Sequence, residues 1–236
     1  MQTTEIDLNL YRRTAQTDSI AEIHAEVMHN FQRVGPPFGF AGMKAPSVPD
    51  FGADTATGYD IRYGIRGIHA EGIYKYRKEG HNIDHAALDD ALFIKFKIPN
   101  KRLDYRSILH EHFPELVAAF GAYRAYVGFG YHGTQYCGGW QRTNPIYNRL
   151  LADKSINVDG RNNIFTLEPA MYWDALLCQR ALGCGRDEVI RRLEGQVVKV
   201  MPLMDGVYIV FNDDPNLSYE AFVAINDKFK PILGLI

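Results

Sequence analysis

The stretch "QVVKVMPLMDGVYIVFNDDPNLSYEAF", residues 196–222, decides the fold. Its first two runs, QVVKVMPL and GVYIVFN, are rich in β-branched and apolar residues and are separated by Met204, Asp205 and Gly206. Two such runs joined by a short turn predict a β-hairpin. A helix follows, because Ser218 is a preferred N-cap residue and Glu220 lies in the first turn, where the helix dipole favours negative charge. We therefore expect Ser218 to have a structural role.

The adjacent acids Asp213 and Asp214 stand between the hairpin and this helix. A calcium loop needs oxygen ligands at several fixed positions and a closing Glu, and Pro215 and the spacing here do not fit that pattern. Asn, Asp and Pro are instead the usual residues of turns. The two acids are therefore interpreted as part of a turn, with an acidic knob that binds a partner as the alternative.

Outward from this stretch, the chain alternates strands and helices without a regular order. In "IDLNLY", Ile6, Leu8 and Leu10 point to one side and Asp7 and Asn9 to the other, as in a strand with one buried face. The other predicted strands are a hairpin of 61–65 with a run after Gly72, and single strands at 92–98, 122–133 and 163–167. The predicted helices are one that starts at the capping-box pair Ser19 and Glu22, one at 106–121 that Pro114 kinks or divides, and three more at Pro169 to Gly183, at 186–193 and at Ser218 to Pro231.

Hairpins joined to helices in irregular order favour an α+β fold with a mostly antiparallel, twisted sheet and helices packed on it. A chain of 236 residues suits one large domain or two small ones. We expect a single domain over 1–236, with two subdomain-like halves as an option and a polar break near 99–102. The Gly- and Pro-rich segment 35–58 is expected to be a loop that lies against the body, because it carries Phe38, Phe40, Met43 and Phe51.

The net charge of −2 gives no global sign of a nucleic-acid or membrane partner, since both favour a basic face. Cys137, Cys178 and Cys184 are too few and too irregularly spaced for a disulfide framework or a zinc site. The first residues lack the pattern of a signal peptide, and no stretch reaches the length of a spanning helix. These features predict a cytoplasmic protein without a cofactor.

The histidines are the remaining source of catalytic chemistry. His81 and His85 have a spacing that allows two metal ligands on one helical face, whereas His110 and His112 do not share a face. A metal-assisted hydrolase is therefore the alternative function, and its ligands would come from His69, His81, His85, His110, His112 and His132. No nucleophile, phosphate loop or metal motif is otherwise present in the sequence, so we expect a binding protein that is not an enzyme.

The segment "GFGYHGTQYCGGW", 128–140, is predicted to be a strand end followed by a Gly-rich loop. Its aromatic residues Tyr131, Tyr136 and Trp140 are expected to be partly exposed. Tyr and Trp dominate the energetics of protein interfaces, so these three residues either contact a protein partner or serve plain packing.

The C-terminal third, "NIFTLEPAMYWDALLCQRALG" and "GVYIVFNDDPNLSYEAFVAINDKFKPILGL", resembles the immunity protein 52 family of polymorphic toxin systems. The resemblance covers 160–236 well and the N-terminal part loosely. It implies an α+β fold, no enzymatic activity, and binding to a cognate toxin, such as a type VI secretion effector of the restriction-endonuclease-like nuclease class. The family has a prominent tryptophan, which Trp173 in "YWDALL" matches; from its sequence context we expect a helix residue that packs on the sheet.

A nuclease has a basic cleft, so acidic groups on an antidote can imitate the phosphates of its substrate. The acids available are the pairs Asp89–Asp90, Asp187–Glu188 and Asp213–Asp214. Asp213, Asp214, Tyr131, Tyr136 and Trp140 are accordingly the predicted toxin-binding residues. Binding away from the active site of the toxin, or disruption of its assembly, remains equally open.

Overall fold

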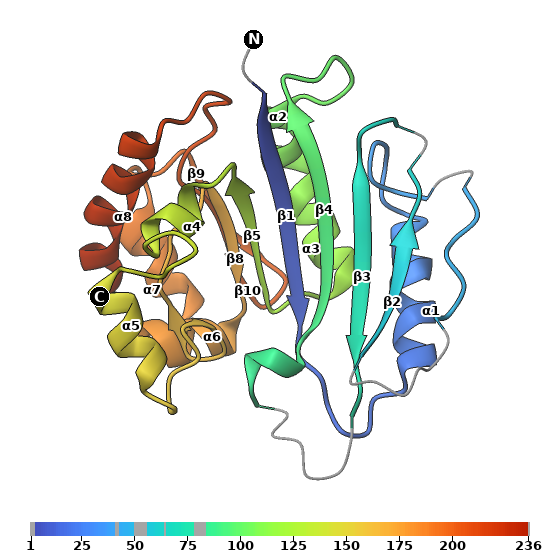
Figure 1. Cartoon of the computed structure of the whole chain (residues 1–236), viewed down its shortest axis with the longest axis horizontal. Coiled ribbons are helices and arrows are strands. Elements are labelled where there is room, and N and C mark those ends of the chain that lie inside the picture. Colours follow the sequence, from blue (N-terminus) through green and yellow to red (C-terminus); the bar gives the residue numbers. More distant parts are fainter. Residues whose placement is uncertain (1–2, 41–42, 50–55, 64, 78–83, 236) are drawn as a thin grey trace.

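The computed structural model describes residues 3–40, 43–49, 56–63, 65–77 and 84–235. These residues form an eight-stranded sheet in which every neighbouring pair is antiparallel, in the order β2-β3-β4-β1-β5-β8-β10-β9 (Figure 1). The strands are β1 (Thr4–Arg12), β2 (Ala56–Ile61), β3 (His69–Lys75), β4 (Asp90–Ile98), β5 (Arg124–Phe129), β8 (Ala170–Trp173), β9 (Lys199–Leu203) and β10 (Gly206–Val210), with a separate pair β6 (Asp159–Gly160) and β7 (Asn163–Ile164). The predicted α+β fold with an antiparallel sheet and helices packed on it is confirmed.

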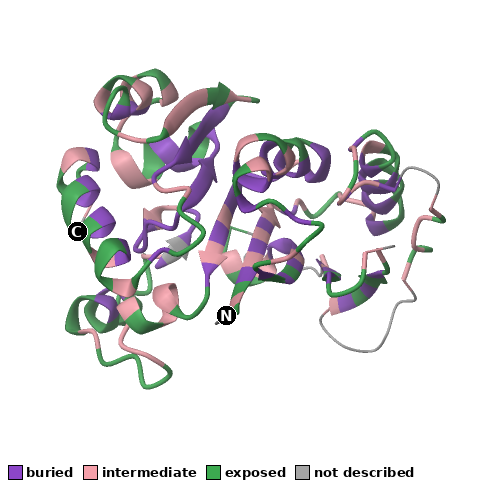
Figure 2. Ribbon diagram, turned by 90° about the horizontal axis from the view of Figure 1, so that it is seen from above, coloured by how far each residue is buried: buried purple, intermediate pink, exposed green. Residues whose placement is uncertain are grey.

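The helical elements lie on both sides of this sheet. They are α1 (Ile20–Phe31), η1 (Ala86–Leu88), α2 (Tyr105–Ser107), η2 (Ile108–His112), α3 (Phe113–Phe120), α4 (His132–Tyr136), α5 (Pro145–Ala152), α6 (Ala175–Leu182), α7 (Arg186–Leu193) and α8 (Tyr219–Leu233). Figures 1 and 2 show α1 and α3 together behind β1–β4, and α4, α5 and α8 on the other side, beside the C-terminal strands. No helix among the described residues combines the length and hydrophobicity that a membrane span requires.

The two faces of β1 differ, as its alternation predicts. Ile6, Leu8 and Leu10 are fully buried on the helical face of the sheet. Asp7 and Asn9 point to the opposite side, which we call the open face, and pair across β4 and β5 with residues that share this face. The helical face therefore holds the core, and the open face is left for other contacts.

Pro114 starts a second helix, which is one of the two outcomes predicted for it. Pro114 stands in the first turn of α3. The five residues that precede α3 form the π-helix η2. Proline has no N–H to bond the carbonyl four residues earlier, which belongs to His110. Lys199 Nζ donates to that oxygen instead, at 3.1 Å, and so satisfies the freed acceptor.

Several predicted boundaries are wrong, each for a physical reason. The segment 170–173 is β8 and not helix: a strand in the middle of a sheet is apolar on both faces, and a short apolar run lacks a period that separates strand from helix. The helix begins only after Asp174, whose side chain caps it. Trp173 is thus a sheet residue, fully buried, which corrects its predicted place on a helix.

The other corrections are smaller. Residues 132–136 form α4 where a loop was predicted, and β2 covers Ala56–Ile61, so the predicted loop 35–58 ends earlier and the first hairpin strand lies before 61–65. The predicted strand 163–167 is limited to β7. Helix α8 passes through Pro231 and stops at Gly234, whose left-handed φ of 77° lets its N–H reach the carbonyls of Lys230 and Pro231.

The predicted N-caps and the buried loop agree with the structure. Ser19 accepts from Glu22 N in α1, and Ser218 accepts from Ala221 N at 3.2 Å in α8. Phe38 and Phe40 of the Gly- and Pro-rich segment are buried in the core, and Phe51 lies outside the described residues. The sheet takes strands from both sides of the polar break at 99–102. Whether the chain acts as one domain stays a prediction.

Candidate functional site

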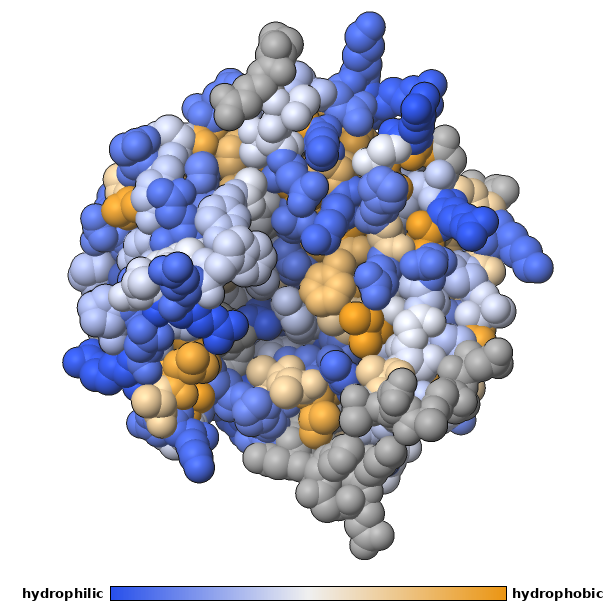
Figure 3. Space-filling view, in the orientation of Figure 1, coloured by the Kyte–Doolittle hydropathy of each residue, from blue (hydrophilic) through white to orange (hydrophobic). Residues whose placement is uncertain are grey.

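A cleft of about 600 Å³ opens on the open face of the sheet. Its floor consists of side chains from β1, β4 and β5, and its wall is formed by the segment from α4 to Arg142 together with 163–168. Figure 3, in the orientation of Figure 1, shows this face hollowed near its centre. The floor residues include Asp7, Asn9, Phe93, Lys95 and Tyr126.

Strand register explains why these side chains meet. Asn9 pairs with Phe93 on one side and with Tyr126 on the other, so the three form one row across β4, β1 and β5. Asp7 pairs with Lys95 and with Gly128 in the next row on this face. Gly128 has no side chain, and a Cβ there would come within 3.5 Å of the Asp7 Cβ.

The cleft carries charges of both signs. Lys95 Nζ lies 3.5 Å from Asp7 Oδ1. Burial raises the pKa of Asp7 above its ordinary value of 3.8, and the charge of Lys95 opposes that rise. The Arg124 guanidinium lies 4.1 Å from the centre of the Tyr11 ring, a cation–π contact that holds it at one end of the floor. Burial of the Tyr126 hydroxyl raises its pKa well above 10.

Glu168 and Trp173 also line the cleft. Glu168 is buried, and α4 passes so close to it that a Cβ on Gly133 would meet Glu168 Oε1 at 2.3 Å. Trp173 is fully buried beside the cleft, and its indole N–H has no hydrogen-bond acceptor among the described residues. A buried donor without an acceptor costs about 1–3 kcal/mol, so the site is not optimised for stability alone.

Trp140 stands at the mouth of the cleft with 85% of its surface exposed. Its ring centre is 5.6 Å from that of Tyr131, which is itself 41% exposed. The two preceding glycines set this position: Gly138 and Gly139 have φ of 95° and 69°, and a Cβ on Gly138 would meet Thr143 N at 2.2 Å. The sequence "CGGW" therefore turns the chain so that the indole projects outward.

The predicted toxin-binding residues do not form one surface. Trp140 and Tyr131 lie together at the cleft, and Tyr136 is half-buried against α8, where Lys230 Nζ donates to its hydroxyl at 3.2 Å. Asp213 lies elsewhere, with its Oδ2 at 3.1 Å from His110 Nε2 on the helical face. Asp214 accepts from Asn216 N at 2.9 Å, which is the geometry of the predicted turn.

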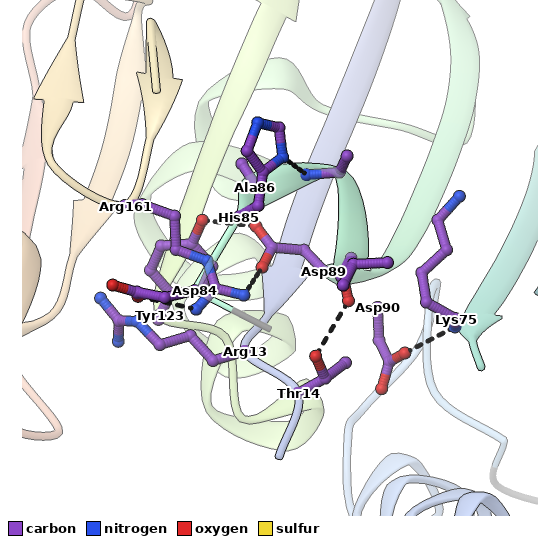
Figure 4. A network of polar contacts seen from close by, with 12 residues as sticks. Arg13, Thr14, Lys75, Asp84, His85, Ala86, Asp89, Asp90, Tyr123 and Arg161 are labelled. Carbon is purple, nitrogen blue, oxygen red and sulfur yellow. Dashed lines mark hydrogen bonds and ion pairs between the residues drawn. The ribbon is translucent and has the colours of Figure 1, made fainter. Parts of the chain in front are cut away.

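The acid pair Asp89–Asp90 is not available to a partner, which corrects the expectation of exposed acids there. Asp89 is 3% exposed and accepts from Arg161 and from the Tyr123 hydroxyl, at 2.5 Å for the latter (Figure 4). Asp90 is fully buried, accepts from Lys75 N at 2.9 Å and pairs with Arg77. Burial raises the pKa of Asp90 to about 6.

Asp89 belongs to an ionic network that joins distant parts of the chain. Arg13 pairs with Asp174, and Arg180 Nη1 lies 2.9 Å from Asp84 Oδ1. Each pair connects the N-terminal strands with the C-terminal third. Figure 4 shows Arg13, Arg161 and Tyr123 gathered around Asp84 and Asp89. The role of Asp89 is therefore structural.

The histidines of the alternative hydrolase are dispersed. His110 contacts Asp213, His132 Nε2 lies 3.0 Å from the Leu217 carbonyl oxygen, and His85 Nδ1 accepts from Ala87 N. His112 packs edge-on to Phe38, and His69 is exposed at the end of β3. His81 lies outside the described residues. Within the described ranges, no three His, Cys, Asp or Glu side chains gather in a metal-ligating group.

Sequence reasoning missed the floor of the cleft. The outward direction of Asp7, Asn9 and Lys95 was visible in the alternation of their strands. Their assembly into one concave surface was not, because it depends on the pairing of β1 with both β4 and β5, which are far apart in the sequence. Register between distant strands has no local sequence signal.

Comparison with known proteins concerns the fold. No protein-family model matches the chain, and no curated protein matches it. Among solved structures, the chain is similar to a T6SS (type VI secretion system) protein of Pseudomonas aeruginosa, with a TM-score of 0.51 and 13% sequence identity over 97% of this chain and 76% of that chain. At this identity the likeness extends to the α+β architecture and not to individual site residues.

Proposed function

We propose that this protein is an immunity protein, which binds the toxin of a T6SS or another polymorphic toxin system and neutralises it without catalysing a reaction. The toxin is of the nuclease class, and the protein acts in the cytoplasm, where such a toxin would meet its substrate. The exposed aromatic pair of Trp140 and Tyr131 at the mouth of the cleft carries the proposal. The solvent-exposed indole has no packing role that would explain it.

An exposed tryptophan held in place by its neighbours is typical of a binding surface. Trp and Tyr are enriched among the few residues that supply most of the energy of protein interfaces. The glycine turn sets the backbone from which the Trp140 indole projects, and the Tyr131 ring contacts that indole, so the position of the side chain is partly set before a partner binds. This preorganisation distinguishes Trp140 from the other large hydrophobic residues on the surface, such as Leu176 and Val198.

The toxin system is supported by one structural comparison and was suggested by one sequence resemblance, for which no family model matches. The chain shares its fold with a protein described as a T6SS protein, and its C-terminal third resembles the immunity protein 52 family. The second likeness lies in 160–236, which supplies β8, β9 and β10 of the sheet. Both support the toxin system of the proposal, and neither names a residue that contacts the toxin.

Of the inhibition modes that the sequence leaves open, imitation of a nucleic acid is the one that the positions of the acids disfavour. Imitation of a nucleic acid needs exposed, unpaired carboxylates. Of the six acids predicted from the sequence, Asp89 and Asp90 are buried, and Asp213, Asp187 and Glu188 are paired with His110, Arg186 and Arg191, respectively. Only Asp214 among these six is both exposed and outside an ion pair with the described residues. We therefore propose that the protein binds through the aromatic mouth of the cleft, at a surface of the toxin that need not be its phosphate-binding site.

Co-expression tests the proposal. The toxin gene beside the gene for this protein is induced in a bacterial host, with and without this protein, and survival and complex formation by size-exclusion chromatography are measured. We expect restored growth and a stable complex. Continued killing in cells that contain the folded, soluble protein, with no complex, would contradict the proposal.

A further inference from the structure

A second cavity adjoins the cleft and extends it across the sheet. It has a volume of about 490 Å³ and is lined by the turn between β2 and β3. Glu71, Phe93 and Lys95 line both cavities, so the two are neighbours on one face of the sheet, and we call them together the groove. The groove reaches from the β2–β3 turn at one end to Trp140 at the other.

The groove runs across the strands. Strand register places Asp60, Glu71, Phe93, Asn9 and Tyr126 in one row on the open face, from β2 through β3, β4 and β1 to β5. Adjacent strands lie about 4.8 Å apart, so the distance from β3 to β5 is about 14 Å, the length of about four residues of extended chain. This linear shape suits a polypeptide segment better than a compact small molecule.

The charges along the groove indicate the class of occupant. Arg62, Arg66 and Lys95 line the second cavity together with Asp60 and Glu71, so both signs are interleaved. Nucleic acids prefer a face of uniformly positive charge, which this groove does not offer. A polypeptide can match mixed signs along its length.

One position in the row calls for a basic side chain. Asp60 lies directly opposite Glu71 in the β2–β3 ladder, and like charges at such a position are unfavourable. Within the described residues, neither carboxylate takes part in a salt bridge or hydrogen bond. A cation placed between the two carboxylates would relieve the repulsion.

We infer that the groove is the docking site for an extended segment of the protein partner, which places a basic side chain at Asp60 and Glu71 and apolar side chains over Phe93 and Tyr126, next to Trp140. The inference rests on the proposed function, because it takes the toxin as the partner. It goes further by naming the surface, the shape of the bound segment and its charge pattern.

Filling the groove tests its occupancy. Asn9→Trp places a large ring in the middle of the row, between Phe93 and Tyr126, and Ala25→Trp places the same ring on the exposed side of α1, behind the sheet. Binding of a catalytically inactive form of the toxin encoded beside the gene is measured by calorimetry. We expect Asn9→Trp to weaken binding by about tenfold or more, as for a residue in an interface core, and Ala25→Trp to bind like the wild type.

Reversing a charge tests the basic side chain. Glu71→Lys and Glu115→Lys make the same change, the first in the groove and the second on the exposed surface of α3. Glu71→Lys is expected to weaken binding about tenfold and to lower the association rate at low salt, because it replaces attraction by repulsion. Glu115→Lys should change neither quantity by more than about twofold.

The outcomes separate this inference from the function on which it rests. Equal binding by wild-type protein and by folded Asn9→Trp would overturn the groove and leave the immunity function standing. Failure of the wild type to bind or protect would overturn both. Hydroxyl-radical footprinting of the wild-type complex gives a second readout that needs no variant: protection of Phe93 and Trp140, but not of Leu176, is expected, and unchanged Phe93 oxidation would contradict docking in the groove.

Discussion

Two regions of the sheet, β1 with β4 and β8 with β10, are built differently. In β1 and β4, one face is apolar and packed under helices, and the other carries polar or half-exposed side chains such as Asn9, Phe93 and Lys95. In β8 and β10, every residue is buried, whichever way it points. Figure 2 shows this contrast as banded colouring in the first group and nearly continuous purple in the second.

This difference separates stability from function within one sheet. The doubly buried strands contribute mainly to folding, since Trp173, Tyr172 and Tyr208 are fully covered. The half-covered strands keep one face free, and the cleft lies there. A sheet covered on both faces throughout would be more stable and would have no comparable surface to offer a partner.

The largest expected effect is on stability, in the strands β8 and β10 that are buried on both faces. Trp173→Ala removes a fully buried indole and should lower the free energy of unfolding by about 3–5 kcal/mol. Phe93→Ala, on the open face, should cost about 1 kcal/mol, because its ring is only half-buried. Urea denaturation measures both values, and equal losses would show that the two regions of the sheet contribute equally to stability.

The ionic network below the cleft should be nearly as sensitive. Asp89→Ala leaves the buried Arg161 guanidinium with only the more distant and exposed Asp84 as an ion-pair partner, and the Tyr123 hydroxyl without its acceptor. Loss of one member of a buried ion pair typically costs about 3–5 kcal/mol. If Asp89→Ala lowers the free energy of unfolding by less than about 1 kcal/mol, the network does not contribute appreciably to stability.

The pH dependence of stability depends on Asp90. Because burial raises its pKa from 3.8 to about 6, the folded protein binds a proton more readily than the unfolded chain between these values. The contribution of Asp90 to stability is thus fully present below pH 3.8 and is lost as the pH rises through 6. Between pH 6 and 4, the wild type should gain up to about 1.4 kcal/mol per pH unit relative to Asp90→Asn. A pH-independent difference, or one of opposite slope, would show that the Arg77 charge outweighs burial.

The smallest effects come from the helix caps, and they test whether the two ends unfold together. Ser19 caps α1 at one end, and Ser218 caps α8 at the other. Each Ser→Ala change should cost about 1 kcal/mol. If the chain is one domain, both variants shift the same single thermal transition. Two transitions, each moved by only one of the variants, would instead indicate two subdomain-like halves.

The same contrast explains which parts of the fold the sequence reveals. In β1 and β4, strict alternation marks both the strand and its buried face, and the caps mark α1 and α8. In "AMYW", no alternation exists, because a central strand with two buried faces needs apolar residues throughout. The prediction of a helix over Pro169–Gly183 therefore began too early, and Trp173 was placed on the wrong kind of element.

The candidate site was predictable only in its exposed part. Aromatic residues in a glycine-rich segment indicated Trp140 and Tyr131. The acids Asp89 and Asp90 looked equally exposed, because the partners that bury them, Arg161 and Arg77, are identified only by tertiary contacts. Burial of a charged residue depends on such distant partners, which local sequence does not show.

The binding of Trp140→Ala to the inactive toxin tests whether the partner binds at the mouth of the cleft. The control is Leu176→Ala, which removes an exposed hydrophobic side chain from α6, away from the cleft. The account predicts that Trp140→Ala raises the dissociation constant by about 30-fold or more, as for an interface hot spot, without changing the unfolding midpoint, whereas Leu176→Ala binds like the wild type. Wild-type affinity in a folded Trp140→Ala variant would contradict the claim that the partner binds at the mouth of the cleft.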